Sequence, residues 1–311
     1  MTAIATLTLN PTIDGSSEAE TVRHTHKVHT SNKRFDPGGA GINVARVLAR
    51  LGSDVEAVYL AGGVTGPVLG GLLDRAGIPR QCVEIAGDTR ISLAVHERDT
   101  GKEYRFVPAG PELTFEERQR CLDALSQLSC SWLVVSGSLP RGVPDDFYAE
   151  IIDLAQMKNM RLVLDTSGPA LKAALARGGV YLVKPSLGEM EQLVGTPLRE
   201  PERIIAEAQR VVATGSAEII AVTMGHQGAL LAHAGGVLTL PALAVEVRSA
   251  VGAGDSFVAA MTHGLAMGRS IEDAFRLGIV AGTAAVMTPG TDLCRREDVE
   301  RLATAIGICG S

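Results

Sequence analysis

The sequence lacks paired cysteines, an excess of positive charge and any long apolar run. Its net charge of −6 makes nucleic acid a poor partner. No apolar run approaches the ~20 residues that cross a bilayer, and Met1–Ser17 lacks the basic and apolar segments of a signal peptide. We therefore expect a cytoplasmic protein without a membrane partner. The five cysteines have no C-x-x-C spacing and are interpreted as packing thiols in a reducing compartment: Cys82, Cys121, Cys130, Cys294 and Cys309.

Short apolar runs and helical segments alternate over most of the chain. With 311 residues, 46% of them hydrophobic, the chain is long enough for one large core with an appendage. From about Leu113 onward, the alternation predicts βαβ units, a parallel sheet covered by helices, and a ligand crevice at the carboxyl ends of the strands. The predicted strands are Trp132–Ser136, Arg161–Asp165, Tyr181–Lys184 and Ile219–Thr223. The predicted helices are Phe115–Leu128, Asp145–Met157, Pro169–Ala176, Gly188–Val194 and Pro201–Thr214.

Polar or glycine-rich turns follow the four predicted strands, as a ligand crevice requires. Each turn taken singly also fits an ordinary connection between a strand and a helix. The turns are Ser136-Gly137-Ser138, Asp165-Thr166-Ser167, Lys184-Pro185-Ser186 and Thr223-Met224-Gly225.

Two segments interrupt the alternation and predict a small separate sheet. Glu20–Phe35 has strand-like character, and Arg90–Val107 is typical of a hairpin that turns at residues 99–101. A small sheet leaves one face uncovered, so it should close over a ligand, pair with another subunit, or both. The first segment is basic between residues 21 and 35 and has no carboxylate there until Asp36. It is either a solvated face or a lid that attracts an anionic substrate such as a sugar phosphate.

Two glycine-rich loops run into predicted helices. The run Ser249–Ser256 follows the strand-like Leu243–Val247 and opens the helix Phe257–Leu265. Its glycines allow backbone N–H groups to converge on an anion at the helix N-terminus, and Asp255 could take a proton from a hydroxyl group there. The alternative is that Asp255 only caps the helix. The second loop, Asp36–Arg46, opens a helix that ends at Gly52.

With these motifs the chain resembles the ribokinase-like sugar kinases, and most of all the branch with bacterial minor 6-phosphofructokinases, 1-phosphofructokinases and tagatose-6-phosphate kinases. The resemblance runs nearly end to end, through residues 6–14, 37–46, 104–106, 136–140, 184–186 and 251–256. It implies a three-layer α/β/α fold with a mainly parallel central sheet and a small β-sheet lid. It also implies one kinase domain over residues 1–311, with the lid formed by segments of about 14–35 and 88–107.

The resemblance also implies a role for individual residues. Asp255 matches the catalytic base, which we expect to be ionised at neutral pH from its reference pKa of ~3.9. The anion hole over the transferred phosphoryl group matches Gly252, Ala253 and Gly254. Sugar contacts match Asp14, Gly38, Gly39, Asn43 and Ser138. The phosphate already on the sugar matches Arg90 and Arg105, with Lys27 supplied by a second subunit. The nucleotide matches Lys184, Ser186, Thr223, Gly225 and Gly228.

Two positions depart from the family pattern. Ser186 replaces an asparagine of a magnesium-water site, in which Glu189 matches the carboxylate; a hydroxyl can still bind a metal-bound water, so Mg²⁺ is expected. Backbone carbonyls of Val251 and Gly290 match ligands of a monovalent cation, but Asp292 stands where related phosphofructokinases tend to have a basic residue. Dependence on K⁺ is therefore left open.

The resulting hypothesis is ATP-dependent phosphorylation of a ketohexose phosphate. Fructose 6-phosphate is the leading substrate, with its 1-hydroxyl as acceptor and fructose 1,6-bisphosphate as product. The alternatives are 1-phosphofructokinase, tagatose-6-phosphate kinase and a non-catalytic sugar-phosphate sensor, which would have no need of Asp255. A homodimer through the lid is expected because the outer strands need cover.

Overall fold

The larger of two β-sheets forms the centre of the protein. A computed structural model describes residues 3–307. The strands of this sheet are β1 (Ile4–Thr8), β4 (Val55–Gly62), β5 (Arg80–Ile85), β8 (Trp132–Ser136), β9 (Arg161–Asp165), β10 (Val180–Val183), β11 (Ala217–Thr223), β12 (Ala229–His233) and β13 (Gly236–Leu240). Their order is β13-β12-β11-β10-β9-β8-β1-β4-β5. All neighbours from β11 to β5 are parallel, whereas the pairs β11–β12 and β12–β13 at one edge are antiparallel, so that β12 runs against the other strands.

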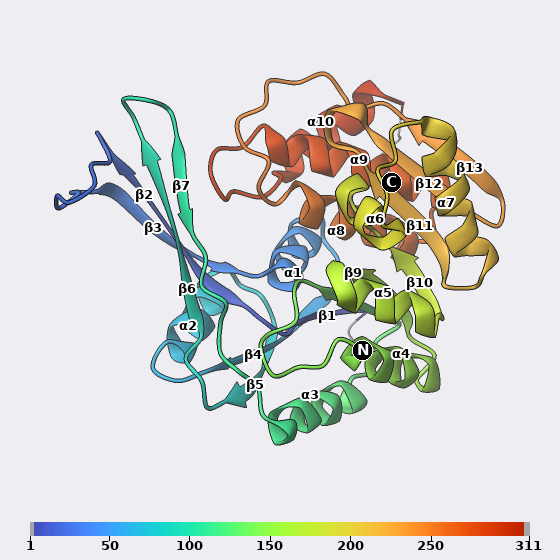
Figure 1. The fold of residues 1–311 in the computed structure, drawn as a ribbon, viewed down its shortest axis with the longest axis horizontal. Coiled ribbons are helices and arrows are strands. Elements are labelled where there is room, and N and C mark those ends of the chain that lie inside the picture. Colours follow the sequence, from blue (N-terminus) through green and yellow to red (C-terminus); the bar gives the residue numbers. More distant parts are fainter. Residues whose placement is uncertain (1–2, 308–311) are drawn as a thin grey trace.

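Helices cover both faces of this sheet, which gives three layers (Figure 1). Successive residues of the buried strands point to opposite faces, so Ile4 and Val134 pack in one core while Ala5 and Val135 pack in the other. The first core is covered by α1 (Ala40–Arg50), α2 (Gly66–Arg75), α8 (Ala253–Ala266), α9 (Ile271–Val286) and α10 (Arg296–Ala305). The second is covered by α3 (Phe115–Gln127), α4 (Phe147–Met157), α5 (Gly168–Arg177), α6 (Leu187–Val194) and α7 (Pro201–Ala213).

The smaller sheet, which we call the lid sheet, projects from the α/β body (Figure 1). It consists of β2 (Thr12–Ala19), β3 (Ser31–Gly38), β6 (Arg90–Glu97) and β7 (Glu103–Phe106) in the order β3-β2-β6-β7. The β2–β6 pair is parallel, and the two outer pairs are antiparallel.

The register of the lid sheet separates an apolar face from a polar one. Residues paired across neighbouring strands lie on the same face. One row across all four strands is Phe35, Gly15, Leu93 and Phe106, whereas the adjacent row on the other face is Arg34, Ser16, Ala94 and Arg105. The polar face continues toward the body with the row Asp36, Asp14 and Ser92 and the row Gly38, Thr12 and Arg90. On the apolar face, Phe35, Leu93 and Phe106 are 38%, 48% and 59% exposed.

Most of the predicted elements are confirmed, with two corrections. Leu243–Val247 is not a strand: its apolar side chains Leu243, Val245 and Val247 line a cavity instead of a sheet. Glu20–Phe35 is not one strand, because residues 20–30 form the turn between β2 and β3. The hairpin over Arg90–Val107 is confirmed as β6 and β7.

The described cysteines Cys82, Cys121, Cys130 and Cys294 carry free thiols, and Cys309 lies outside the described residues. Between residues 3 and 307, no helix combines the length and the apolar character needed to span a bilayer.

Candidate active site

The N-terminus of α8 forms the centre of the candidate site. Gly252 caps the helix with φ of 73°, and a Cβ on it would lie 2.6 Å from the Leu293 side chain. Both the backbone conformation and the lack of space therefore require glycine at this position. The helix begins at Ala253, and the first N–H groups of an α-helix have no acceptor within the helix. Ala253 and Gly254 therefore offer donors to an anion, in agreement with the predicted anion hole.

Asp255 lies in the first turn of α8 and contacts helix α1. Its Oδ2 accepts a hydrogen bond of 2.8 Å from Nδ2 of Asn43. Burial, together with the nearby charge of Asp165, raises the pKa of the Asp255 carboxyl to about 7, although the Asn43 amide and the Lys184 ammonium act in the opposite direction. The expectation of an ordinary, fully ionised carboxylate is thus corrected, because the surroundings of Asp255 favour its protonated form far more than water does.

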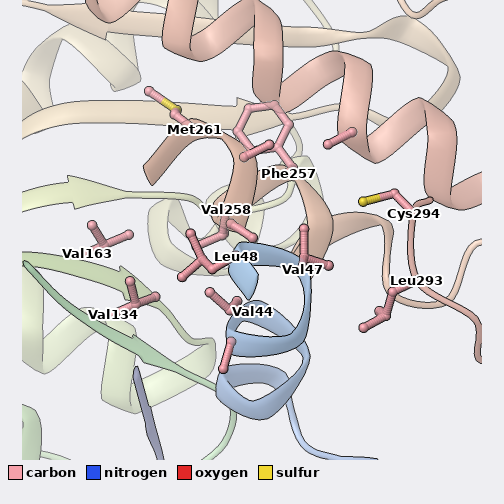
Figure 2. Close-up of a cluster of buried hydrophobic side chains, with 14 of the residues drawn as sticks. Val44, Val47, Leu48, Val134, Val163, Phe257, Val258, Met261, Leu293 and Cys294 are labelled. Atoms are coloured by element: carbon pink, nitrogen blue, oxygen red, sulfur yellow. The ribbon is translucent and has the colours of Figure 1, made fainter. Parts of the chain in front are cut away.

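Packing of α1 on α8 brings Asn43 and Asp255 together. Val44, Val47 and Leu48 of α1 lie beside Phe257 and Val258 of α8 in one buried cluster (Figure 2). These apolar contacts hold the two helix N-termini at a fixed spacing, so the polar pair at their ends is formed by the fold itself.

Asp14 lies on the polar face of the lid sheet, close to the turn that precedes α1. A Cβ on Gly38 would lie 2.0 Å from Oδ2 of Asp14, so the carboxylate fits only beside glycine. Gly39 has φ of 106°, which any other residue would strain to adopt. Burial raises the pKa of Asp14 to about 6, and Arg105 opposes this shift.

The predicted phosphate ligands occupy different surroundings. Arg90 donates to the carbonyl oxygens of Pro11, Pro108 and Asn10 at 3.3, 3.0 and 2.8 Å, so it also holds loops together. Arg105 is exposed and lies 3.8 Å from Glu103. Arg105 is therefore exposed on the lid sheet beside Glu103, whereas Arg90 is held in one position by three backbone carbonyls.

Two further predicted residues lie at the margin. Lys27 is exposed in the segment between β2 and β3. Ser138 follows β8, and its Oγ accepts a 3.5 Å hydrogen bond from Nδ2 of Asn10. Their roles in substrate binding stay predictions.

A cavity of about 820 Å³ opens on the other side of α8. It is lined by Ala253 and Gly254, by apolar side chains that include Leu243, Val245 and Phe257, and by every residue predicted to bind the nucleotide or its metal: Lys184, Ser186, Glu189, Thr223, Gly225 and Gly228. All residues of this prediction thus line one cavity.

Lys184 is the buried cation of this cavity. Its Nζ lies 3.0 Å from Oδ1 of Asp165 and 3.6 Å from where a side chain on Gly254 would begin. Burial lowers the pKa of Lys184, but the adjacent Asp165 carboxylate outweighs this effect and raises it overall. The ammonium group is therefore charged beside the first turn of α8.

Glu189 has a structural contact that the sequence analysis did not anticipate. Its Oε2 accepts from the Ser186 N–H at 2.7 Å, while Ser186 Oγ accepts from the Glu189 N–H at 3.3 Å, which is a capping box at the start of α6. Within the described part of the chain, no group of three or more His, Cys, Asp or Glu side chains could hold a metal ion. A Mg²⁺ ion here would therefore depend on nucleotide phosphates and water for most of its ligands.

The two predicted cation loops lie against each other. Ser249 Oγ donates to the Gly290 carbonyl at 2.7 Å and accepts from the Val251 N–H at 3.2 Å. Asp292, in the second loop, pairs with Arg34 of the lid sheet at 2.8 Å. The loop beside α8 is thus connected to the lid by an ion pair.

Sequence reasoning missed several charged residues that surround the site. Asp165 was placed at a strand end without a role, yet it binds Lys184 and also accepts a 3.0 Å hydrogen bond from Ser136. Arg46 was noted only as the last residue of a motif, although it is 7% exposed and contacts Asn43. At helical spacing Arg46 lies opposite the apolar face formed by Val44, Val47 and Leu48, so the sequence carried no signal that it is buried.

Comparisons with known proteins find a matching family model and similar enzymes. Residues 8–298 match the model of the pfkB family carbohydrate kinases. The ATP-dependent 6-phosphofructokinase isozyme 2 of Mycobacterium tuberculosis is 44% identical over 301 residues, covering 96% of this chain and 88% of the relative. A 1-phosphofructokinase of Borreliella burgdorferi is 31% identical over 308 residues, 98% of each chain.

Solved structures with a similar fold include a phosphofructokinase. Phosphofructokinase-2 from Escherichia coli in complex with potassium has a TM-score of 0.94 and 38% identity, covering 98% of this chain and 99% of that one. The same protein in complex with fructose-6-phosphate has a TM-score of 0.92 and 37% identity, with the same coverage.

Proposed function

Because the chain belongs to the pfkB family of carbohydrate kinases, we propose that it transfers the terminal phosphoryl group of ATP to the 1-hydroxyl of fructose 6-phosphate. The products are fructose 1,6-bisphosphate and ADP. The similarity to proteins named 6-phosphofructokinase, and to a structure with fructose-6-phosphate bound, supports this substrate.

One observation carries the proposal: Asp255 lies between two different binding regions. Its neighbour Gly254 lines the 820 Å³ cavity. The Asp255 carboxylate contacts Asn43 of α1, the helix that follows strand β3 of the lid sheet. Asp14, on the neighbouring lid strand β2, is close enough to raise the pKa of Asp255. A sugar on the lid side and a nucleotide in the cavity would therefore meet at this carboxylate.

The cavity has the chemistry of a nucleotide site. Apolar residues such as Leu243, Val245 and Phe257 would cover a purine ring, and Gly225 and Gly228 at the end of β11 leave room for ribose and phosphates. Lys184 and the N–H groups of Gly252, Ala253 and Gly254 would neutralise the charge that moves during transfer.

In the reaction, Asp255 accepts the proton of the sugar hydroxyl as its oxygen attacks the terminal phosphorus. The new O–P bond forms, the bond to the bridging oxygen of ATP breaks, and ADP leaves with that electron pair. The raised pKa of Asp255 gives it a greater affinity for the proton than an exposed carboxylate has.

Two metal ions belong to this proposal. Mg²⁺ would be held by the phosphates and, through water, by the second oxygen of Glu189 near Ser186; it would neutralise phosphate charge. K⁺ would be held by backbone carbonyls of Val251 and Gly290, whose loops Ser249 joins. The relative solved with potassium supports the second site.

The lid supplies the remaining contacts. Asp14, Gly38, Gly39 and Asn43 would bind sugar hydroxyl groups, with Ser138 at the margin. Arg90 and Arg105 project from the polar face and would bind the 6-phosphate, an anion that suits bidentate guanidinium groups. Lys27, at the exposed turn, would reach the site of a second subunit.

A homodimer through the lid sheet is part of the same proposal. The exposed row of Phe35, Leu93 and Phe106 is an apolar surface that pairing of two lids would cover. The free cysteines are consistent with a cytoplasmic enzyme.

A steady-state assay tests the substrate. Purified protein would be given ATP and Mg²⁺ with fructose 6-phosphate, fructose 1-phosphate or tagatose 6-phosphate, and ADP formation would be followed. We expect the highest kcat/KM with fructose 6-phosphate. Turnover of unphosphorylated sugars alone would refute the proposal, and a preference for fructose 1-phosphate would assign the chain to the 1-phosphofructokinases. No turnover with any sugar phosphate, despite binding, would favour a sensor.

A further inference from the structure

Arg46 is a buried arginine whose donors converge on one turn of the structure. Its Nη1 donates to the Pro37 carbonyl at 3.0 Å and to Asn43 Oδ1 at 3.4 Å, and its Nη2 lies 3.5 Å from Asp36 Oδ1. Only 7% of its surface is exposed. Keeping a guanidinium group in such a place is costly, so its contacts call for an explanation.

The contact with Asn43 decides the orientation of a side-chain amide. Oδ1 of Asn43 faces the Arg46 guanidinium and Nδ2 faces the Asp255 carboxylate. Rotating the amide by half a turn would set the NH₂ group against a cation and the oxygen against an anion. Both contacts would then be repulsive, so Arg46 and Asp255 together admit a single orientation.

We propose that Arg46 is a positioning residue, which holds the Asn43 amide with its N–H groups directed at the Asp255 carboxylate. The Asn43 N–H stabilises the ionised, proton-accepting form of Asp255, and the second N–H of the same NH₂ group remains for a sugar hydroxyl. The importance of this for phosphoryl transfer rests on the proposed function, whereas the positioning itself does not.

Other charged groups face the two partners and must be counted. Asp255 is approached by Asp165 from β9, Lys184 from the end of β10 and Asp14 from β2. Arg46 is approached by Asp36 and Arg34 from β3, Arg50 from α1 and Asp14 from β2. Asn43 joins Arg46 and Asp255 through hydrogen bonds, whereas Asp14 acts on both through its charge. Loss of Arg46 raises the pKa of Asp14, which would lower the pKa of Asp255, so a rise in the Asp255 pKa identifies the route through the amide.

A purely structural role makes a different prediction. If Arg46 only fastened the turn before α1 through the Pro37 carbonyl, its loss would lower stability and leave the titration of Asp255 unchanged. The two roles are therefore separated by a measurement of that titration.

The chain offers a simple spectroscopic probe, because it contains only four asparagines: Asn10, Asn32, Asn43 and Asn159. Protein labelled with ¹⁵N-asparagine gives one side-chain NH₂ pair for each, and Asn43→Asp identifies the pair of Asn43. In the wild type we expect this pair to shift with pH as Asp255 titrates. In Asp255→Asn the shift should vanish. A wild-type Asn43 signal that does not titrate would overturn the proposal.

Three variants complete the test. In Arg46→Met the midpoint should rise by about one pH unit, because the N–H contact to the carboxylate is lost. Arg46→Lys keeps the charge but loses the forked contact, so its midpoint should rise by less than that of Arg46→Met. The matched control is Arg50→Met, which removes a charge from the next turn of α1 whose donors go to Leu293 and Cys294 instead; its midpoint should stay at the wild-type value. If Arg46→Met does not fold, Arg46→Lys decides alone. An unchanged midpoint refutes the proposal.

The pH profile of kcat/KM for fructose 6-phosphate is measured beside the spectra. A parallel rise of the kinetic midpoint in Arg46→Lys extends the proposal to catalysis. A spectroscopic shift in a protein that does not phosphorylate fructose 6-phosphate would leave the positioning intact and refute the proposed function. Turnover of fructose 6-phosphate by the wild type, with no shift of the Asn43 midpoint in the Arg46 variants, would support the proposed function and refute the positioning role of Arg46.

Discussion

Replacing Asp255 with asparagine should abolish turnover and yet stabilise the protein. The carboxylate is placed where ionisation is costly: it is surrounded by protein, and Asp165 lies nearby with the same charge. An amide of almost the same shape removes that cost. Loss of activity together with a gain in stability is expected where a residue is kept for catalysis and not for stability.

The magnitude follows from the pKa. Folding raises the pKa of Asp255 from 3.8 to about 7, a change of about 3 units, which corresponds to a ceiling of about 4 kcal/mol. Asp255 as a whole residue is only partly buried, and solvent screening reduces the cost, so we expect about half of this, ~2 kcal/mol. Because the folded pKa is the higher one, the cost is absent below pH 3.8, grows as pH rises, and is complete above pH 7. For 311 residues, this corresponds to a Tm increase of ~3 °C.

Calorimetry of both proteins from pH 5 to pH 8.5 checks the stability, and the ATP-dependent assay checks the rate. The variant should gain Tm over the wild type progressively with pH and should lose kcat by a factor of about 10³ or more, with sugar-phosphate binding largely retained. A variant less stable than the wild type at pH 8 would refute the buried-charge argument. Near-normal kcat would refute the role of base.

Three further predictions concern the lid and the pH dependence. Gly38→Ala should raise the KM for fructose 6-phosphate at least tenfold with little change in Tm, because its Cβ would displace the Asp14 carboxylate; unchanged kinetics would exclude Asp14 as a sugar ligand. The kcat/KM of the wild type should fall tenfold per pH unit below about pH 7, where Asp255 becomes protonated; a profile that stays flat down to pH 5 would contradict this. Leu93→Glu with Phe106→Glu should give monomers in analytical ultracentrifugation, because the charges would lie on the exposed apolar row; an unchanged dimer would place the interface elsewhere, and a monomeric wild type that is fully active would remove the dimer from the proposal.

The fold and the family were predictable because both leave local patterns in the chain. The strand Trp132–Ser136 is apolar throughout and buried on both faces, so its sequence alone identified it. The glycine loops could be recognised in the sequence because only glycine suits such turns, as the positive φ of Gly252 and its close approach to Leu293 show. The match of residues 8–298 to the family model confirmed the resemblance.

What could not be predicted depends on contacts between distant segments. The apolar pattern of Leu243–Val247 was read as a strand, because a cavity wall and a buried strand both select alternate apolar residues. The pKa of Asp255 follows from burial and from Asp165, 90 residues away in sequence by their numbering. Ser186 and Glu189 had the spacing of a capping box, but the family pattern drew attention to metal binding.

The ion pair between Arg34 and Asp292 limits which substitutions these two positions tolerate. Arg34 lies between two carboxylates, Asp36 on its own strand and Asp292 across the cleft. A basic residue at position 292 would place two cations together, so a sequence that acquires one there must lose the arginine at position 34 or let the two segments separate. An Arg34→Asp, Asp292→Arg exchange should therefore restore the ion pair between the two segments, but not the contact of position 34 with Asp36.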